Sequence, residues 1–131
     1  MTKAITISDQ SPSGKSVGSI FLTGISDRST LRDLIRTRVR EEVAAYNLKP
    51  PKKFHGLVMP EGGEVGKNEF VMKRPRRVDW EKQADVAAKA FEKSGFFVLV
   101  GGKQVTELDE DLELADGADV RFVRLIPLIG G

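Results

Sequence analysis

The clearest candidate for chemistry in this sequence is the carboxylate with which it ends. The last ten residues alternate as a strand does and then run through an apolar stretch into two glycines, Gly130 and Gly131. Two residues without a Cβ atom can enter a channel too narrow for any side chain. We therefore expect the Gly131 carboxylate to be the reacting group, with Gly130 giving it access. The alternative is that the chain finishes in small, flexible residues, as many chains do.

The rest of the composition removes most catalytic and metal chemistry. The chain has no cysteine and a single histidine, His55. This excludes a thiol nucleophile, a disulfide and a cysteine–histidine zinc cluster. The neighbours of His55 favour a surface or packing role over a catalytic one. We accordingly expect no metal site, no cofactor and no catalytic residue in this chain.

Length and hydropathy indicate one globular domain. At 131 residues the chain can bury a substantial core but is short for two domains. Its composition, 40% hydrophobic and 31% charged, is typical of a globular protein. The longest apolar run, Phe96 to Val100, has the length of a strand, far below the roughly 20 residues of a membrane span. Without an apolar signal region near Met1, we expect a cytoplasmic protein with no membrane partner.

Charge is distributed unevenly along the chain. Basic residues outnumber acidic ones over residues 49–78, whereas acidic residues dominate residues 103–119. The basic excess is concentrated in a short run that holds Arg74, Arg76 and Arg77. No aromatic residues interleave with this run and no helix carries it, so a solvated or partner-binding face is favoured over nucleic-acid binding.

The first third of the chain predicts a hairpin followed by a helix. Residues 4–8 and 17–23 alternate apolar and polar side chains with the period of two of a half-buried strand, and turn-forming residues join them. Apolar residues then recur every three or four positions over residues 31–46. Thr30 and Asp33 have the form of a capping box at the start of this amphipathic helix, with Asp27 or Ser29 as the alternative cap.

The stretch after this helix is less regular. Glycines and an asparagine mark tight turns between two possible short strands, at residues 54–59 and 69–72. Asp79 is a good N-cap for a second helix, whose apolar stripe begins at Trp80. Gly95 is the expected C′ residue, because glycine is favoured in the left-handed conformation that ends many helices.

The final third predicts three strands, at residues 96–100, 103–105 and 120–125, with Gly101 and Gly102 as the turn of a hairpin. Together with the first hairpin they predict a mixed sheet of four or five strands wrapped around the first helix. Matched apolar periodicity places eight residues in the core, namely Leu34, Ile35, Val39, Val98, Leu99, Val100, Phe122 and Leu125.

The order of these elements resembles that of the β-grasp proteins, which include ubiquitin and the bacterial sulfur carriers related to the small subunit of molybdopterin synthase and the thiazole-synthesis carrier. Four segments carry the resemblance: TLRDL at 30–34, VLVGGKQV at 98–105, LADGADV at 114–120 and RLIPLIGG at 124–131.

The resemblance implies an α+β, ubiquitin-like β-grasp fold with an inserted hairpin and a second helix. It implies one domain over residues 1–131, in which the insertion occupies about residues 48–94 and a C-terminal tail occupies residues 126–131. A bare carrier needs little beyond the grasp and the tail, so the insertion suggests a dedicated partner.

In such families the protein is not the enzyme. The resemblance implies that an ATP-dependent adenylating enzyme activates the Gly131 carboxylate. The product is either an amide bond to a lysine of a target protein or a thiocarboxylate that donates sulfur. A conjugating enzyme and a deconjugating peptidase are possible further partners. The residues expected to contact partners are Pro127, Leu128, Ile129, Arg74, Arg76 and Arg77.

Other interpretations stay open at this point. Protein modification and sulfur transfer use the same tail, so the tail does not choose between them. The chain is alternatively a non-conjugated β-grasp interaction module whose apolar tail docks into a partner. A third interpretation is a nucleic-acid binder that uses residues 73–77.

Overall fold

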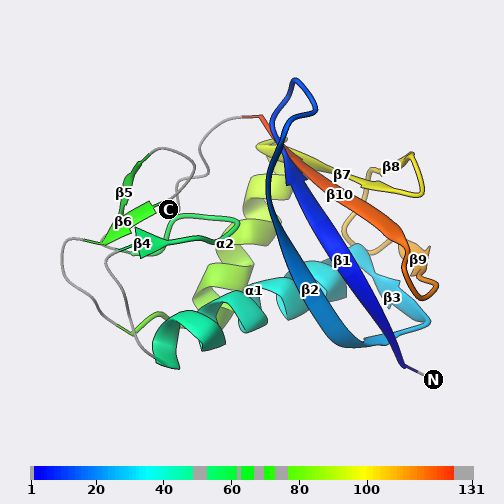
Figure 1. The fold of residues 1–131 in the computed structure, drawn as a ribbon, viewed down its shortest axis with the longest axis horizontal. Coiled ribbons are helices and arrows are strands. Elements are labelled where there is room, and N and C mark those ends of the chain that lie inside the picture. Colours follow the sequence, from blue (N-terminus) through cyan, green and yellow to red (C-terminus); the bar gives the residue numbers. More distant parts are fainter. Residues whose placement is uncertain (1, 49–52, 62, 67–69, 73–76, 126–131) are drawn as a thin grey trace.

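The computed structural model describes residues 2–48, 53–61, 63–66, 70–72 and 77–125. They form a mixed five-stranded sheet, a two-stranded sheet, a three-stranded sheet and two helices, α1 (Leu31–Leu48) and α2 (Trp80–Glu92). Figure 1 shows the large sheet at one end of the molecule and the three-stranded sheet at the other, with the helices between them.

The large sheet joins the two ends of the described chain. Its strands are β1 (Thr2–Gln10), β2 (Ser16–Ser26), β7 (Phe96–Val100), β8 (Lys103–Val105) and β10 (Asp119–Arg124), in the order β2-β1-β10-β7-β8. β1 and β10 run parallel, and the other neighbouring pairs are antiparallel. The predicted first hairpin and mixed sheet are confirmed.

The hairpin between β7 and β8 follows from its glycines. Gly101 and Gly102 both have positive φ angles, 57° and 81°. Such angles at both central positions are those of a type I′ turn, whose twist matches that of the flanking strands. The predicted two-residue connection is therefore confirmed.

Helix α1 begins where two separate segments satisfy its free N–H groups. The Asp33 N–H donates to Thr30 Oγ1 at 3.1 Å, which confirms the predicted cap. The N–H groups of Leu31 and Arg32 donate to the backbone carbonyls of Glu110 and Leu108. The first turn of a helix leaves its N–H groups without intrahelical partners. Residues 103–119, called the acidic segment below, supply these partners at the start of α1.

A small sheet fixes the acidic segment in this position. β3 (Arg28–Thr30) pairs antiparallel with β9 (Asp111–Glu113), and the Leu114 N–H donates to the Asp27 carbonyl at 3.0 Å. The sequence did not predict these two strands, since each is only three residues long and no turn joins the two.

The segment predicted as an insertion, residues 48–94 and called the insertion below, contains a three-stranded sheet rather than the predicted pair of strands. β4 (Lys53–Phe54) and β5 (Gly63–Val65) both pair antiparallel with the central β6 (Phe70–Met72). The residues after β4 leave the sheet, so the strand predicted at 54–59 is wrong beyond Phe54.

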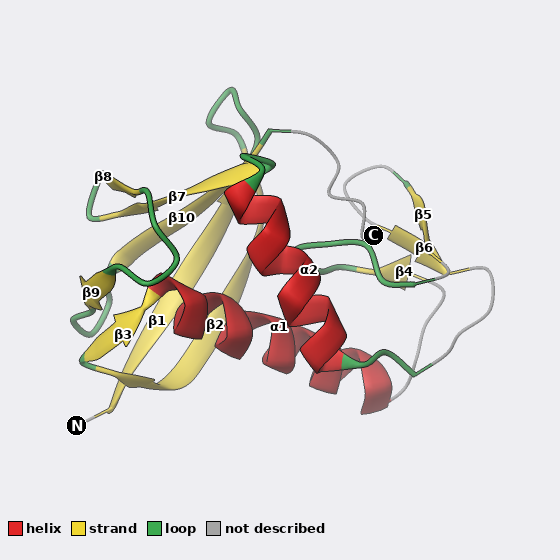
Figure 2. Ribbon diagram, turned by 180° about the vertical axis from the view of Figure 1, so that it is seen from behind, coloured by secondary structure: helices red, strands yellow, loops and turns green. Residues whose placement is uncertain are grey.

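The insertion shares the core of the large sheet. Tyr46 of α1 contacts Phe54 of β4 edge to face, with ring centroids 5.1 Å apart. Leu57, Val58 and Met72 of the insertion are buried in the same hydrophobic cluster as the sheet residues. α1 and α2 also pack against each other, as Figure 2 shows from behind.

Helix α2 starts as predicted and ends differently. The Asp79 carboxylate accepts hydrogen bonds from the N–H groups of Glu81 and Lys82. At the other end Ser94, with a φ of 61°, takes the left-handed position that was predicted for Gly95. The Gly95 N–H instead donates to the Ala90 carbonyl at 2.9 Å, so the glycine lies one position beyond the left-handed residue of this closing motif.

Most of the predicted core residues are buried. Leu34, Ile35, Val39, Val98 and Phe122 are buried, and Leu99 and Val100 are half-buried. Leu125 is 41% exposed, so its predicted burial is wrong. The reason is that β10 ends at Arg124, and Leu125 follows it outside the sheet.

Asn47 holds the end of α1 to the start of α2. Its side-chain amide donates to the Val78 carbonyl, and its side-chain oxygen accepts from the Val78 N–H, both at 2.9 Å. We expect Asn47→Leu to lower the free energy of unfolding by about 2 kcal/mol or more, because two partly buried backbone groups lose their partners. Denaturant unfolding measures this, with Gln104→Leu at an exposed position as the control. Equal losses in the two variants would contradict the assignment.

Candidate functional site

The candidate site is the end of β10, from which the sequence continues into residues 126–131. The predicted site residues Pro127, Leu128, Ile129, Gly130 and Gly131 lie outside the residues that the structure describes. For this site the structure therefore describes the strand end that precedes these residues.

The predicted basic partner-binding surface is described only in part. Arg74 and Arg76 lie outside the described residues, and Arg77 is exposed. Arg77 lines a small pocket together with Lys82 of α2 and Glu61. Among the described residues, no contact joins Arg77 to the end of β10.

A buried ionic cluster lies beneath the end of β10. The Arg38 guanidinium donates two hydrogen bonds to the Asp9 carboxylate, both at 2.6 Å. Arg124, the last residue of β10, donates to the same carboxylate at 3.0 Å. Arg38 also donates to Glu42 at 3.4 Å. Two cations and two carboxylates thus meet where β1, α1 and β10 come together.

The strand topology explains why the four charged residues of the cluster lie close together. β1 and β10 run parallel, so their carboxyl ends lie side by side and Gln10 is aligned with Val123. Asp9 and Arg124 are consequently close although they are far apart in sequence. Arg38 and Glu42 are separated by one helical turn and face the same side of α1.

The charged side chains of this cluster are largely buried in the core. The side chains of Arg38, Glu42 and Asp9 are 1%, 7% and 8% exposed, and Arg124 is 23% exposed. The Arg38 guanidinium lies over the Phe122 ring of β10, 4.8 Å from its centroid. A buried guanidinium is tolerated when carboxylates and hydrogen bonds compensate for its lost hydration. The Asp9 carboxylate provides most of that compensation through its two short bonds.

The electrostatics of the cluster stabilise the charged form of Arg38 and the protonated form of Glu42. Burial alone lowers the pKa of Arg38, but the carboxylates of Glu42 and Asp9 outweigh burial and raise it. Burial raises the pKa of Glu42, and the attraction of Arg38 offsets this only in part. Burial also lowers the pKa of Arg124, although Asp9 opposes the shift.

The cluster also connects the strand end to the insertion. Besides its contact with Arg38, the Glu42 carboxylate accepts a hydrogen bond from the Leu57 N–H at 3.4 Å. Gln83 of α2 donates to the neighbouring Val58 carbonyl at 2.6 Å. The same backbone turn therefore contacts both helices, and the insertion is part of the support beneath β10.

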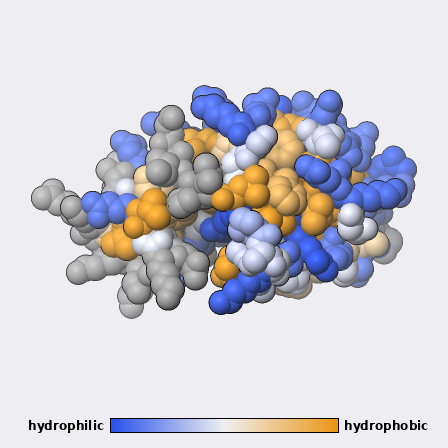
Figure 3. All heavy atoms as spheres, turned by 90° about the horizontal axis from the view of Figure 1, so that it is seen from above, coloured by the Kyte–Doolittle hydropathy of each residue, from blue (hydrophilic) through white to orange (hydrophobic). Residues whose placement is uncertain are grey.

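Leu125 marks the surface beside the strand end. Its N–H donates to the Gly95 carbonyl at 3.1 Å. Its side chain lines a groove of about 600 Å³ between the end of α2 and the β7–β8 hairpin. Phe91, Phe97 and Leu108 supply apolar lining to this groove. Figure 3, a view from above, shows apolar residues lying among hydrophilic ones on that face of the molecule.

Charged residues line the same groove beside the apolar ones. The groove is lined by the carboxylates of Glu92, Glu107 and Asp109 and by Arg32. Arg32 is committed to Asp109 through hydrogen bonds of 2.9 and 3.3 Å, and this contact raises the pKa of Arg32 and lowers that of Asp109. The groove is therefore apolar and acidic rather than basic.

Sequence reasoning missed the ionic cluster, although two signals for it are present. Asp9 continues the inward alternation of Ile5 and Ile7, and Arg38 falls within the apolar stripe of α1. A charged residue on a face that must be buried predicts a charged partner on the opposing element. Arg124 lies two residues after Phe122, on the same face of β10, and contacts Asp9 there.

Comparisons with known proteins add no relative. No known protein family, curated protein or solved structure matches the chain. Neither of the two described helices combines the length and the hydropathy that a membrane span requires. The described residues also contain no group of three histidine, cysteine or acidic side chains that would hold a metal ion.

The raised pKa of Glu42 makes a prediction about pH. In the folded protein Glu42 holds its proton to a higher pH than in the unfolded chain, where the ordinary value is 4.5. The tighter binding of this proton in the folded protein adds to the free energy of unfolding. The added stability is fully present below pH 4.5 and is lost as the pH rises through the folded pKa. Glutamine resembles the protonated form at every pH. We expect the stability of Glu42→Gln relative to the parent to increase as the pH rises above about 4.5.

Denaturant unfolding at a series of pH values measures this difference. The control is Glu41→Gln, which changes the neighbouring, exposed carboxylate and should give a small difference. A Glu42→Gln difference that is largest at low pH would contradict the raised pKa.

Proposed function

We propose that the chain is a ubiquitin-like protein modifier on a β-grasp fold. In this proposal a partner enzyme adenylates the Gly131 carboxylate with ATP, and the carboxylate is then transferred to target lysines. The chain itself supplies the fold, the contact surfaces and the reacting group, and the partner supplies the catalysis.

The order and packing of the described elements support the β-grasp part of the proposal. A hairpin is followed by a helix, a strand, a short hairpin strand and a last strand, and the mixed sheet formed by these strands packs on that helix. This is the order on which the resemblance to ubiquitin and the sulfur carriers depends. The three-stranded sheet and α2 stand between the first helix and β7 as the inserted unit.

The observation that carries the functional part is the way in which β10 is held. β10 lies between β1 and β7 in the middle of the large sheet, and its last residue is tied to Asp9 of the buried cluster. The residues that follow therefore start from a point fixed by the core. A reacting group at the end of a short tail gains from such an anchor, because the partner has fewer conformations to restrict when it binds.

The chemistry suits a glycine carboxylate. A carboxylate oxygen of Gly131 attacks the α-phosphorus of ATP, and pyrophosphate leaves. The resulting acyl-adenylate is attacked by a lysine amine, which loses a proton as the amide bond forms and AMP leaves. Gly130 and Gly131 present no side chain that would block approach to either partner.

Two alternatives remain as proposals. In the first, a sulfur nucleophile takes the acyl group and leaves a thiocarboxylate at Gly131. In the second, the chain is an interaction module that docks without conjugation. The half-exposed Leu125 beside an apolar groove favours this second alternative, because the groove offers a place for an apolar segment.

A protease digest tests the proposal directly. Trypsin cleaves after Arg124, so a target lysine modified by this chain would retain the heptapeptide Leu-Ile-Pro-Leu-Ile-Gly-Gly on its side chain. We expect mass spectrometry to find this remnant after tagged protein is expressed in its source cells and purified under denaturing conditions. Deleting Gly131, or changing Gly130 to Trp, should abolish the remnant without changing the melting temperature.

The matched control separates the alternatives. An alanine added after Gly131 removes the glycine carboxylate but keeps every apolar residue, so conjugation should stop while docking should persist. A thiocarboxylate would appear as an intact mass in which one oxygen is replaced by sulfur. Conjugates that persist in the protein lacking Gly131 would contradict the proposal.

A further inference from the structure

Four arginines form a ladder along one side of the molecule. Arg28 lies on β3, and Arg32, Arg36 and Arg40 follow on α1 at intervals of four residues. Residues four apart lie on neighbouring turns of the same helix face. The three arginines on α1 therefore place positive charge at the spacing of successive helical turns, and Arg28 precedes them on β3.

The first two arginines already bind carboxylates of the acidic segment. Arg28 donates to Glu113 at 3.0 Å, and Arg32 donates to both oxygens of Asp109 at 2.9 and 3.3 Å. Glu113 and Asp109 are themselves four residues apart and run in the opposite direction to the arginines. The molecule thus contains an example of the ligand that this ladder accepts.

The other two arginines have no carboxylate partner among the described residues. The guanidinium groups of Arg36 and Arg40 instead lie over the ring of Trp80, at 5.0 and 5.8 Å from its centroid. A guanidinium that contacts an aromatic ring through a cation–π interaction can still donate its N–H groups to a carboxylate. Arg36 and Arg40 therefore lie beside Trp80 with no carboxylate partner among the described residues.

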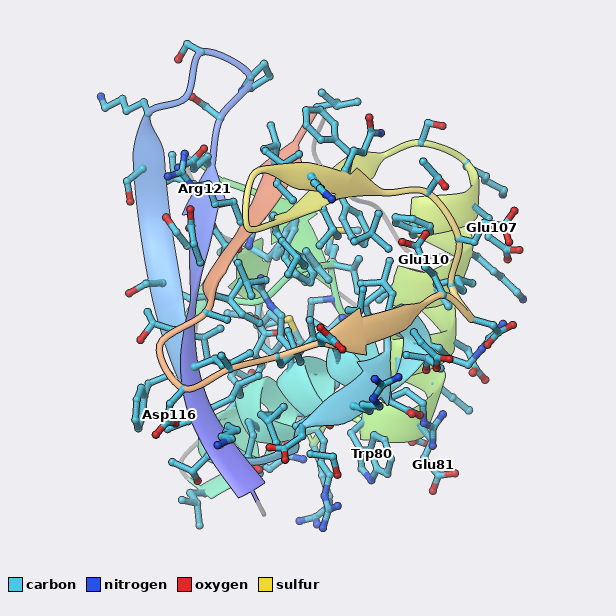
Figure 4. All side chains as sticks on the ribbon, turned by 90° about the vertical axis from the view of Figure 1, so that its right-hand side faces the viewer. Trp80, Glu81, Glu107, Glu110, Asp116 and Arg121 are labelled. Carbon is cyan, nitrogen blue, oxygen red and sulfur yellow. The ribbon has the colours of Figure 1, made fainter. Side chains whose placement is uncertain are left out.

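These groups line a groove of about 380 Å³ between β2, α1 and the start of α2. Arg28, Arg36, Arg40 and Trp80 line it together with residues 24–26 of β2. Asp33 is the carboxylate among its described lining residues, and Glu81 follows Trp80 on the exposed side of α2. Figure 4 shows Trp80 and Glu81 together at the start of α2, away from Glu107 and Glu110 of the acidic segment.

We propose that this groove binds an acidic segment of a partner protein, with two carboxylates placed on Arg36 and Arg40. The partner segment continues the pattern that Asp109 and Glu113 begin, so that all four arginines are paired. Carboxylates suit the site because a guanidinium donates two parallel hydrogen bonds to them. The proposal does not depend on the tail or on conjugation.

The geometry favours an acidic peptide over nucleic acid. Single-stranded nucleic acid binds by stacking its bases on exposed aromatic rings. In this groove Arg36 and Arg40 already contact the Trp80 ring, with guanidinium carbons 5.0 and 5.8 Å from its centroid, and a stacking base would have to compete with them. The groups left for a ligand are hydrogen-bond donors, which fit the oxygens of carboxylates.

The test uses the full chain and a separate peptide with the sequence of residues 106–114, TELDEDLEL. Binding is measured by calorimetry and by the fluorescence of Trp80, which is the one tryptophan of the chain. We expect saturable binding that weakens as salt is raised, since the contact is between charges. A peptide with glutamine and asparagine in place of the acidic residues should not bind.

Arginine variants test whether the peptide binds at Arg36 and Arg40. Arg36→Gln combined with Arg40→Gln should weaken binding by about tenfold or more, and replacement of both by lysine should weaken it less, because charge is kept but the paired donors are lost. The control is Arg121→Gln, an exposed arginine that Figure 4 places far from Trp80 and that should change binding by less than about twofold.

Each contrary result would overturn the proposal. These results are no binding of the acidic peptide, equal binding of its amide version, or an equal loss in Arg121→Gln. Tighter binding of a poly-uridine oligonucleotide that is lost in the double glutamine variant would show a nucleic-acid site instead. A melting temperature measured for each variant ensures that a loss of binding is scored only for folded protein.

Discussion

The buried pair between Asp9 and Arg38 is the interaction on which the rest of this structure depends. An arginine that is 1% exposed has lost nearly all of its water and needs a carboxylate in a fixed position. Asp9 meets that need only if β1 and α1 are placed as observed. The same carboxylate receives Arg124, so the requirement of one buried cation also fixes the end of β10.

This constraint explains why the insertion belongs to the core. Glu42 lies one turn beyond Arg38 and contacts both the cluster and the backbone of Leu57. Asn47 then holds Val78 at the start of α2. The insertion is thus attached to α1 through polar contacts as well as through the packing of Tyr46 on Phe54, and a change in one part is felt in the other.

Sequence patterns predicted the regular parts of the fold and missed the parts that depend on distant partners. The first hairpin, the two helices and the Gly101-Gly102 turn follow from local periodicity and turn chemistry, and they are confirmed. The three-residue strands β3, β5 and β9 are too short to show a period. Arg38 and Asp9 interrupt apolar faces, and the reason becomes visible only when α1 lies against β1. The tail residues that the sequence singled out lie outside the described residues, so their role stays a prediction.

The most direct test of this account is a double-mutant cycle on the buried pair. Asp9→Asn and Arg38→Gln are measured singly and together by denaturant unfolding at neutral pH. The account predicts that each single change lowers the free energy of unfolding by about 3–5 kcal/mol and that the double change costs little more than either one, because each leaves the other charge without its partner. Losses that simply add would mean that Asp9 and Arg38 act independently, which would contradict the account.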